Sequence, residues 1–213
     1  MNFYCFSGLG ADKSVFQFLK IEGAQLHYVD WIEPLNHESL VDYSQRLVGT
    51  LKLKTPYSFL GVSFGSMIAL EASKTTDPAH TFLVSSAQSS LEIPLIFRLL
   101  ERTKLYKIIP DRLFRTPNRF THYLFGASRL EEKKLLDEII RSTDVKFLKW
   151  AFGAIVKWVP KENKKAVRIH GTTDRIIPIK SQIVNLSIEN GSHFTIVTHA
   201  QQVSEFISSY IKH

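Results

Sequence analysis

Short apolar runs alternate with helical patterns over the first 87 residues, and this alternation limits the possible folds more than any other feature of the sequence. Parallel strands need long crossover connections, which are usually helices, so repeated strand and helix patterns are typical of a parallel sheet covered by helices. The sequence therefore predicts an α/β fold with a mostly parallel sheet. The expected strands cover Phe3–Phe6, Leu26–Val29, Tyr57–Leu60 and His80–Val84, and the expected helices cover Ser14–Lys20, Ser39–Leu51 and Phe64–Ser73.

The region from about Ser90 to Pro160 breaks this rhythm, because it has helical periodicity, several prolines and no convincing strand. Within it, Ser128 followed by Glu131 predicts a capping box at the start of a helix. We expect residues 90–160 to form a helical lid inserted within a single domain that spans residues 1–213. Two lid helices are expected, one with an apolar stripe of Leu135, Leu136, Ile139 and Ile140, and one with Leu148, Ala151, Phe152, Ile155 and Val156.

The strand and helix pattern resumes after Pro160 and a lysine-rich connector. Val167–His170 and Val184–Ile188 are expected to be strands, and a closing helix is expected from about Ala200 to Ile211. With the earlier apolar runs, they predict a sheet of about six strands. The chain length suits one substantial core.

The net charge of +7 is concentrated in the predicted lid, where residues 91–160 carry 14 Lys and Arg residues against 8 Asp and Glu residues. Two interpretations stay open, namely solvated helix faces or attraction of anionic substrates towards the lid. No nucleic-acid motif accompanies the excess, so no nucleic-acid partner is expected. The composition is otherwise ordinary for a globular protein, with 44% hydrophobic and 22% charged residues.

Cys5 is the only cysteine and lies in an apolar run, so no intramolecular disulfide is possible. A buried free thiol suits a reducing compartment, and we expect a cytoplasmic protein. The first residues lack the pattern of a secretory signal, and no stretch has the length of a membrane span. Neither feature is therefore expected.

The residues Gly61-Val62-Ser63-Phe64-Gly65 lie between an apolar strand pattern and an apolar helix pattern. A serine in such a tight strand-to-helix turn projects its hydroxyl outward, and small residues on both sides let the chain pass close to itself. The N–H groups at the start of the helix point towards developing negative charge. This context favours Ser63 as a catalytic nucleophile over the alternative, a structural glycine-rich turn.

A nucleophilic serine needs a base, and His193 is the first candidate. It lies in Asn190-Gly191-Ser192-His193-Phe194, a glycine-containing loop after the last expected strand. Loops that leave the carboxyl ends of parallel strands meet at one edge of the sheet, so this imidazole is expected to reach the Ser63 hydroxyl. His199 is the reserve candidate.

Asp174 is the expected carboxylate partner of the histidine. It follows a strand that ends near His170, in the run His170-Gly171-Thr172-Thr173-Asp174-Arg175. A carboxylate there would hold the imidazole in the right tautomer and stabilise its charged form. Taken alone, Asp174 is a turn residue beside Gly171, but the chain order Ser, Asp, His favours the catalytic interpretation. His170 is expected to shape the loop.

The oxyanion of an acyl-transfer reaction needs donors, commonly two backbone N–H groups. We expect one from Phe64, directly after the serine, and one from Leu9 in the loop Ser7-Gly8-Leu9-Gly10 after the first strand. A nucleotide site in that loop is disfavoured, since Lys13 stands where the third glycine of a dinucleotide motif would be. No cofactor and no metal ion are expected.

Four motifs, in this order, carry a family resemblance: Phe6-Ser7-Gly8-Leu9-Gly10, Gly61-Val62-Ser63-Phe64-Gly65, Ile169-His170-Gly171-Thr172-Thr173-Asp174 with Ile177-Pro178, and Gly191-Ser192-His193-Phe194. Together they closely resemble the α/β-hydrolase superfamily over nearly the whole chain. The resemblance implies a mostly parallel sheet, a lid inserted after the strand that follows the nucleophile helix, and acyl transfer through a serine ester. The chain is expected to lack two leading strands of the superfamily, and the helix between Asp174 and His193 is expected to be reduced to a turn.

We therefore expect a serine hydrolase that cleaves a small carboxylic ester or thioester through an acyl-enzyme, with a small-molecule acyl substrate. Two alternatives stay open, an acyltransferase with the same three residues and a catalytically silent ligand-binding protein of the same fold. Aromatic residues of the lid either line an acyl pocket or pack the lid onto the core: Phe97, Tyr106, Phe114, Phe120, Tyr123, Phe125, Trp150 and Trp158. Lid arginines either attract carboxylate or phosphate groups or are solvated: Arg98, Arg102, Arg112, Arg115 and Arg119.

Overall fold

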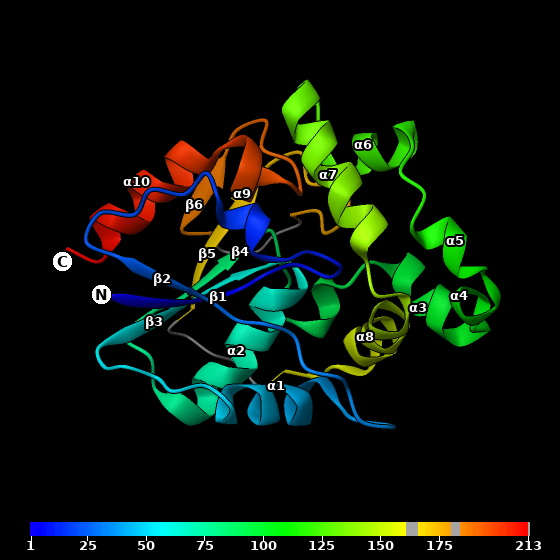
Figure 1. The fold of residues 1–213 in the computed structure, drawn as a ribbon, viewed down its shortest axis with the longest axis horizontal. Coiled ribbons are helices and arrows are strands. Elements are labelled where there is room, and N and C mark those ends of the chain that lie inside the picture. The colour runs from blue at the N-terminus through cyan, green and yellow to red at the C-terminus, as the bar shows by residue number, and fades with distance from the viewer. Residues whose placement is uncertain (161–165, 180–183, 213) are drawn as a thin grey trace.

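The computed structural model describes residues 1–160, 166–179 and 184–212. Its centre is a sheet of six strands in the spatial order β2-β1-β3-β4-β5-β6, and every pairing in it is parallel (Figure 1). The α/β fold and the six-stranded sheet predicted from the sequence are confirmed. The strands are β1 (Asn2–Phe6), β2 (Gln25–Tyr28), β3 (Tyr57–Val62), β4 (Thr81–Val84), β5 (Ala166–Gly171) and β6 (Leu186–Ile188).

Helices cover both faces of the sheet and extend beyond one of its edges (Figure 1). None of the helices described here has both the length and the apolar stretch needed to cross a lipid bilayer. Two are short 3-10 helices, η1 (Lys13–Phe16) and η2 (Ser90–Glu92). The α-helices are α1 (Leu40–Gly49), α2 (Phe64–Thr76), α3 (Leu95–Thr103), α4 (Leu105–Ile108), α5 (Asp111–Phe114), α6 (Arg119–Phe125), α7 (Leu130–Ser142), α8 (Val145–Lys157), α9 (Thr195–Thr198) and α10 (Ala200–Tyr210).

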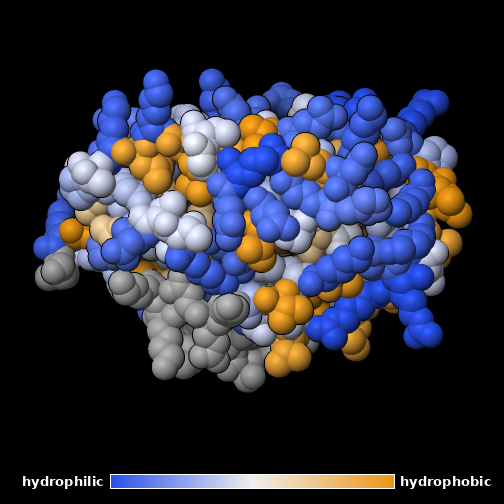
Figure 2. Space-filling model, turned by 90° about the horizontal axis from the view of Figure 1, so that it is seen from below, coloured by the Kyte–Doolittle hydropathy of each residue, from blue (hydrophilic) through white to orange (hydrophobic). Residues whose placement is uncertain are grey.

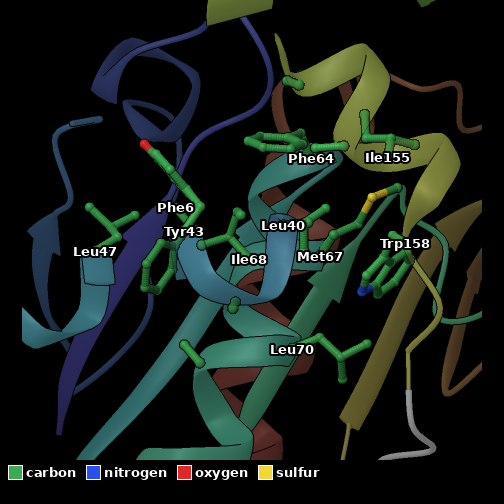
Figure 3. Close-up of a cluster of buried hydrophobic side chains, with 14 of the residues drawn as sticks. Phe6, Leu40, Tyr43, Leu47, Phe64, Met67, Ile68, Leu70, Ile155 and Trp158 are labelled. Carbon is green, nitrogen blue, oxygen red and sulfur yellow. The ribbon is translucent and has the colours of Figure 1, made fainter. Parts of the chain in front are cut away.

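Each face of the sheet has its own hydrophobic core, because successive side chains of a strand point to opposite faces. On β1, Tyr4 and Phe6 belong to the core that includes α1 and α2. Figure 3 shows part of this core, in which Met67 of α2 lies near Trp158. The alternate residues, Phe3 and Cys5, belong to the other core, to which α10 contributes. The sheet is therefore a buried layer between two layers of helices.

Residues 90–157, all described by the structure, connect β4 to β5 and contain only helices and loops. The last two helices of this segment pack on opposite sides of the sheet. Leu136 of α7 belongs to the core that includes α10, whereas Ile155 of α8 belongs to the core that includes α1 and α2. Between α7 and α8, the side chain of Thr143 lies against Gly10 in the loop after β1. The helical segment thus straddles the edge where the strands end.

The crossover from β1 to β2 differs from the expected helix Ser14–Lys20, since only the single turn η1 forms. After this turn, the chain runs along α10. The N–H of Lys20 donates to Oγ of Ser204 at 2.9 Å, and the N–H of Glu22 donates to Oγ of Ser208 at 3.0 Å. Serine hydroxyls of a distant helix thus replace the carbonyl acceptors that a local helix would supply.

The capping box of α7 lies one residue later than the predicted pair Ser128 and Glu131. The helix begins at Leu130, and the carboxylate of Glu132 accepts the N–H groups of Ser128 and Arg129, both at 2.9 Å. Burial of the apolar stripe fixes the rotation of the helix, and this rotation turns Glu132 back towards the cap while Glu131 is exposed. The second expected lid helix is present as α8.

Candidate active site

Ser63 lies in the turn between β3 and α2 and has left-handed backbone angles, with φ 52° and ψ −118°. A residue with a β-carbon is strained in this region, so its neighbours must hold it there. The N–H of Ser63 donates to the carbonyl oxygen of Val84 on β4 at 2.9 Å, and its own carbonyl oxygen accepts from the N–H of Ser66 at 3.0 Å. The turn is therefore fixed from both sides, while the side chain stays half-exposed.

Two glycines allow this turn to pack closely. A β-carbon on Gly61 would lie 2.3 Å from Cα of Ser66, and one on Gly65 would lie 2.1 Å from the carbonyl oxygen of Ser7. These distances are too short for any side chain in a close-packed interior. Gly61 thus lets the end of β3 pass close to the first turn of α2, and Gly65 lets the loop after β1 lie against the turn that carries Ser63.

The loops that carry Asp174 and His193 are joined to each other. They follow β5 and β6, which are parallel neighbours, so both loops leave the sheet at the same edge. The N–H and Oγ1 of Thr173 donate to the carbonyl oxygen of Gly191 at 2.8 and 2.9 Å. A β-carbon on Gly171 would lie 2.2 Å from that same oxygen. This close pairing of the loops holds the side chains of Asp174 and His193 together.

The structure brings Ser63, His193 and Asp174 into one chain of contacts. Nε2 of His193 lies 2.9 Å from Oγ of Ser63, and Nδ1 lies 2.8 Å from Oδ2 of Asp174. Because a carboxylate only accepts hydrogen bonds, Nδ1 must carry the proton of that contact, which leaves Nε2 as the acceptor for the serine hydroxyl. Both Asp174 and His193 are buried. This arrangement can take a proton from a hydroxyl that a substrate can still reach.

Several donors surround the carboxylate of Asp174. Oδ1 accepts from the N–H groups of Ile176 and Ile177, both at 2.9 Å, and Oδ2 lies 3.2 Å from Nε2 of His170. That nitrogen also lies 2.8 Å from the carbonyl oxygen of Ile177, so it carries a proton. Burial by itself raises the pKa of Asp174, but the electrostatic interaction with His193 and these hydrogen bonds outweigh it and hold the pKa well below its ordinary value. The carboxylate is therefore ionised at neutral pH.

The two expected oxyanion donors, the N–H groups of Leu9 and Phe64, belong to segments beside the serine. Phe64 is the first residue of α2, so its N–H has no acceptor within the helix. The loop that carries Leu9 is closed by a hydrogen bond from the N–H of Ala11 to the carbonyl oxygen of Gly8 at 3.0 Å. A β-carbon on Gly8 would lie 3.7 Å from Cβ of Ser63, which places this loop in contact with the turn.

No protein-family model and no curated protein matches the sequence. Solved structures do match the fold. A bromoperoxidase from Bacillus anthracis is 13% identical with a TM-score of 0.74, and the match covers 100% of this chain and 92% of that one. An esterase from Exiguobacterium antarcticum is 16% identical with a TM-score of 0.72, covering 100% and 92%. A thioesterase of the prodiginine pathway from Streptomyces coelicolor is 13% identical with a TM-score of 0.56, covering 98% and 89%.

The chain has the α/β-hydrolase fold. This agrees with the resemblance seen in the sequence. In open parallel sheets ligands commonly bind at the carboxyl ends of the strands, and the loops of Ser63, Asp174 and His193 meet at this edge. Such a fold hosts many activities, so the chemistry must be argued from the side chains themselves.

A buried polar network that contacts the turn of Ser63 was not predicted from the sequence. Oγ of Ser86 donates to the carbonyl oxygen of Ser63 at 2.7 Å. The carbonyl oxygen of Ser86 accepts from the guanidinium of Arg168 at 3.2 Å, and this guanidinium also binds the carboxylate of Glu92 at 2.6 and 3.3 Å. The sequence does hold one signal for this network, namely an arginine inside the apolar strand β5, since a buried arginine requires an acidic partner.

The other candidate residues of this α/β-hydrolase fold lie outside the contact chain. His199 is the residue that precedes α10, and its Nδ1 lies 2.8 Å from Oγ1 of Thr198. Burial lowers the pKa of His199. In the described parts of the chain, no three His, Cys, Asp or Glu side chains are grouped so that they could hold a metal ion.

The aromatic residues expected in the lid divide into two groups. Most serve packing or are exposed; for example, Tyr106 donates to Glu101 at 2.6 Å and Trp158 donates to Glu71 at 2.7 Å. Phe125 is different, because its ring centroid lies 5.6 Å from that of His193. Two aromatic rings that were not singled out in the sequence pack against Phe64 at 5.6 and 5.9 Å, namely Trp31 and Phe147.

Proposed function

We propose that this protein is a serine hydrolase that cleaves a small carboxylic ester or thioester. In this proposal Ser63 is the nucleophile, His193 is the general base and Asp174 orients the imidazole. The single observation that carries the proposal is the contact chain of 2.9 Å from Ser63 to His193 and 2.8 Å from His193 to Asp174. A serine within reach of an oriented histidine base is the arrangement that activates a hydroxyl for acyl transfer.

The proposed reaction has two stages. Nε2 of His193 takes the proton of Ser63 as the serine oxygen attacks the carbonyl carbon, and the imidazolium then protonates the departing alcohol or thiol. This leaves an acyl group on the serine oxygen. Water then loses a proton to His193 and attacks the acyl carbon, which releases the carboxylic acid and restores the serine hydroxyl. The ionised Asp174 stabilises the imidazolium in both stages.

The oxyanion formed in each stage is proposed to bind the N–H groups of Leu9 and Phe64. Backbone donors already held in place stabilise charge without reorganising during the reaction, and loss of one donor commonly costs about a hundredfold in rate. The proposal is supported by the contact between the Gly8 backbone and the Ser63 turn, and by the position of Phe64 at the start of α2.

We propose that residues 90–160 act as the lid that selects the substrate. Helix α6 of this segment is attached to both functional loops. The guanidinium of Arg175 donates to the carbonyl oxygen of Tyr123 at 2.9 Å. The N–H of Phe194 donates to the carbonyl oxygen of Phe125 at 3.1 Å. The position of α6, and with it the Phe125 ring, is therefore linked to the loops of Asp174 and His193. Two of the similar structures are an esterase and a thioesterase, and this suits an ester or thioester substrate.

A substrate panel tests this function. We expect p-nitrophenyl esters or acyl thioesters of some chain length to be hydrolysed by the native protein and not by Ser63→Ala. The same assays with an added alcohol or thiol acceptor identify an acyltransferase, since the product would then carry the acceptor instead of a free acid. Absence of any turnover, together with a rise in Tm on addition of a small ligand, would favour a silent binding protein.

A further inference from the structure

Large aliphatic side chains are exposed on the outer surface of the helices α3, α4 and α5. Leu95 is 75% exposed, Leu99 is 55% exposed and Ile108 is 77% exposed. Single exposed apolar residues are normal, whereas a contiguous exposed apolar patch commonly marks an interaction site. We call this group the α3–α5 surface, and its members are Leu95, Ile96, Leu99, Leu105, Ile108 and Leu113.

These side chains are not needed to attach the helices to the rest of the molecule. The inner side of α3 is formed by Phe97, whose ring stacks on that of Phe152 of α8 with centroids 4.9 Å apart. The inner side of α4 is formed by Tyr106, whose ring also stacks on Phe152, at 5.4 Å. Leu95 and Leu99 are four positions apart and lie together on the outer side of α3. The helix thus has a second apolar face, directed towards solvent.

Basic residues outnumber acidic ones around this surface. Residues 95–115 contain six Lys and Arg residues against two acidic ones. Glu101 is buried and binds Lys104 and Tyr106, and Asp111 is paired with Lys149 at 2.8 Å. At the end of the molecule where α4 and α5 lie, Figure 2 shows hydrophobic side chains among strongly hydrophilic ones. The surface therefore combines protruding aliphatic groups with cations.

A second copy of the chain does not suit this surface, because a symmetric contact would place the same cations against one another. The side chains also protrude instead of lining a groove, so they suit a deformable apolar layer. A bilayer with anionic headgroups supplies both an apolar layer and negative charge, and Lys and Arg side chains can reach its phosphates while their stems stay in the apolar boundary. We propose that the α3–α5 surface docks the protein onto an anionic lipid bilayer.

Vesicle binding by the full chain tests this proposal. We expect the protein to sediment with vesicles of phosphatidylcholine that contain about a third phosphatidylglycerol, with affinity at least about tenfold higher than for phosphatidylcholine alone. Leu95→Glu combined with Leu99→Glu is expected to lower this affinity at least about tenfold. The matched control is Phe18→Glu, which also replaces an exposed apolar residue but lies between η1 and β2, and it is expected to bind normally.

A charge variant tests the contribution of the cations to binding separately from that of the aliphatic side chains. Arg102→Gln combined with Lys107→Gln removes cations and leaves the aliphatic groups, so it is expected to weaken binding to the anionic vesicles alone, and raised salt is expected to do the same. Ser63→Ala is expected to bind vesicles as the native protein does, so failure of the proposed catalysis would not affect this result. Circular dichroism and Tm establish that each variant is folded.

Three results would overturn the docking proposal. The first is absence of binding to either type of vesicle. The second is equal binding by the folded Leu95→Glu and Leu99→Glu variant. The third is a dimer in sedimentation velocity that this variant abolishes, which would assign the surface to a second copy of the chain.

Discussion

The hydroxyl of Ser86 donates a hydrogen bond to the backbone carbonyl oxygen of Ser63 at 2.7 Å, so a residue after β4 holds the strained turn between β3 and α2. Ser86 is itself fixed, since its carbonyl oxygen accepts from Arg168 at 3.2 Å. The position of the proposed nucleophile therefore depends on buried groups outside the contact chain of Ser63, His193 and Asp174. A misplacement of reacting atoms by about 1 Å can cost roughly a hundredfold in rate.

Ser86→Ala is expected to lower kcat about tenfold to a hundredfold while KM changes little, because the turn loses a hydrogen bond that positions Ser63. The matched control is Ser44→Ala. Ser44 is also a buried serine, and it donates at 2.7 Å to the carbonyl oxygen of Ile68 in α2, away from the turn. Both variants should lose about 1 kcal/mol of stability. Equal kcat values for the two variants would show that Ser86 has only a structural role.

The ion pair between Arg168 and Glu92 is buried, with side chains 7% and 9% exposed. Removal of one partner leaves a buried charge without compensation, so Arg168→Met or Glu92→Leu alone is expected to cost about 3–5 kcal/mol of unfolding free energy. The double variant should lose clearly less than the sum of the single losses. Urea denaturation of the four proteins measures this coupling. Additive losses would mean that the two side chains act independently.

Replacement of glycine by alanine is expected to have opposite effects on stability at Gly65 and at Gly49. Gly65→Ala is expected to cost about 1–3 kcal/mol or more and to lower activity, because the new β-carbon would lie 2.1 Å from the carbonyl oxygen of Ser7. Gly49→Ala, at the end of α1 with no atom within 4 Å of the new β-carbon, is expected to raise stability by up to about 1 kcal/mol. Thermal and urea unfolding check both values. A tolerated Gly65→Ala would contradict the close packing of the turn.

The carboxylate of Asp174 makes stability depend on pH in the acid range. Its pKa is lower in the folded protein than in the unfolded chain, where it has the ordinary value near 3.8. The unfolded chain therefore takes up a proton first as the pH falls. The contribution of Asp174 to the free energy of unfolding is complete at pH values above the ordinary pKa of a carboxyl group. It is lost as the pH falls towards the pKa of Asp174 in the folded protein. Urea denaturation between neutral pH and acid should show a steeper loss for the native protein than for Asp174→Asn, and parallel curves would contradict the lowered pKa.

The sequence was sufficient for the main features of the fold and for the candidate site. Strands that carry turn residues at their carboxyl ends bring distant side chains to one edge, so Ser63, Asp174 and His193 could be selected from local patterns. Two local predictions were wrong in detail. In place of the helix expected at Ser14–Lys20, the chain forms the single turn η1 and then hydrogen-bonds to α10. The capping pair of α7 lies one residue later than expected, because burial of the apolar stripe of α7 fixes the rotation of that helix.

The supporting network could not be predicted in the same way. Glu92 and Arg168 are 76 residues apart and meet only because η2 lies over β5 in the folded chain. No local pattern encodes such a pair, and Ser86 is one of several serines in its segment. The helix between Asp174 and His193 was expected to be reduced to a turn. This stretch includes residues 180–183, which lie outside the described residues, and its described part contains no helix.

Covalent labelling is a direct test of Ser63 as the nucleophile, because the proposed reaction requires a single reactive serine hydroxyl. The native protein should react with a fluorophosphonate probe once per chain, and peptide mapping by mass spectrometry should place the adduct on Ser63. Ser63→Ala should remain unlabelled, and His193→Ala should react far more slowly. An adduct on any other residue, or labelling that persists in Ser63→Ala, would contradict the assignment of Ser63 as the nucleophile.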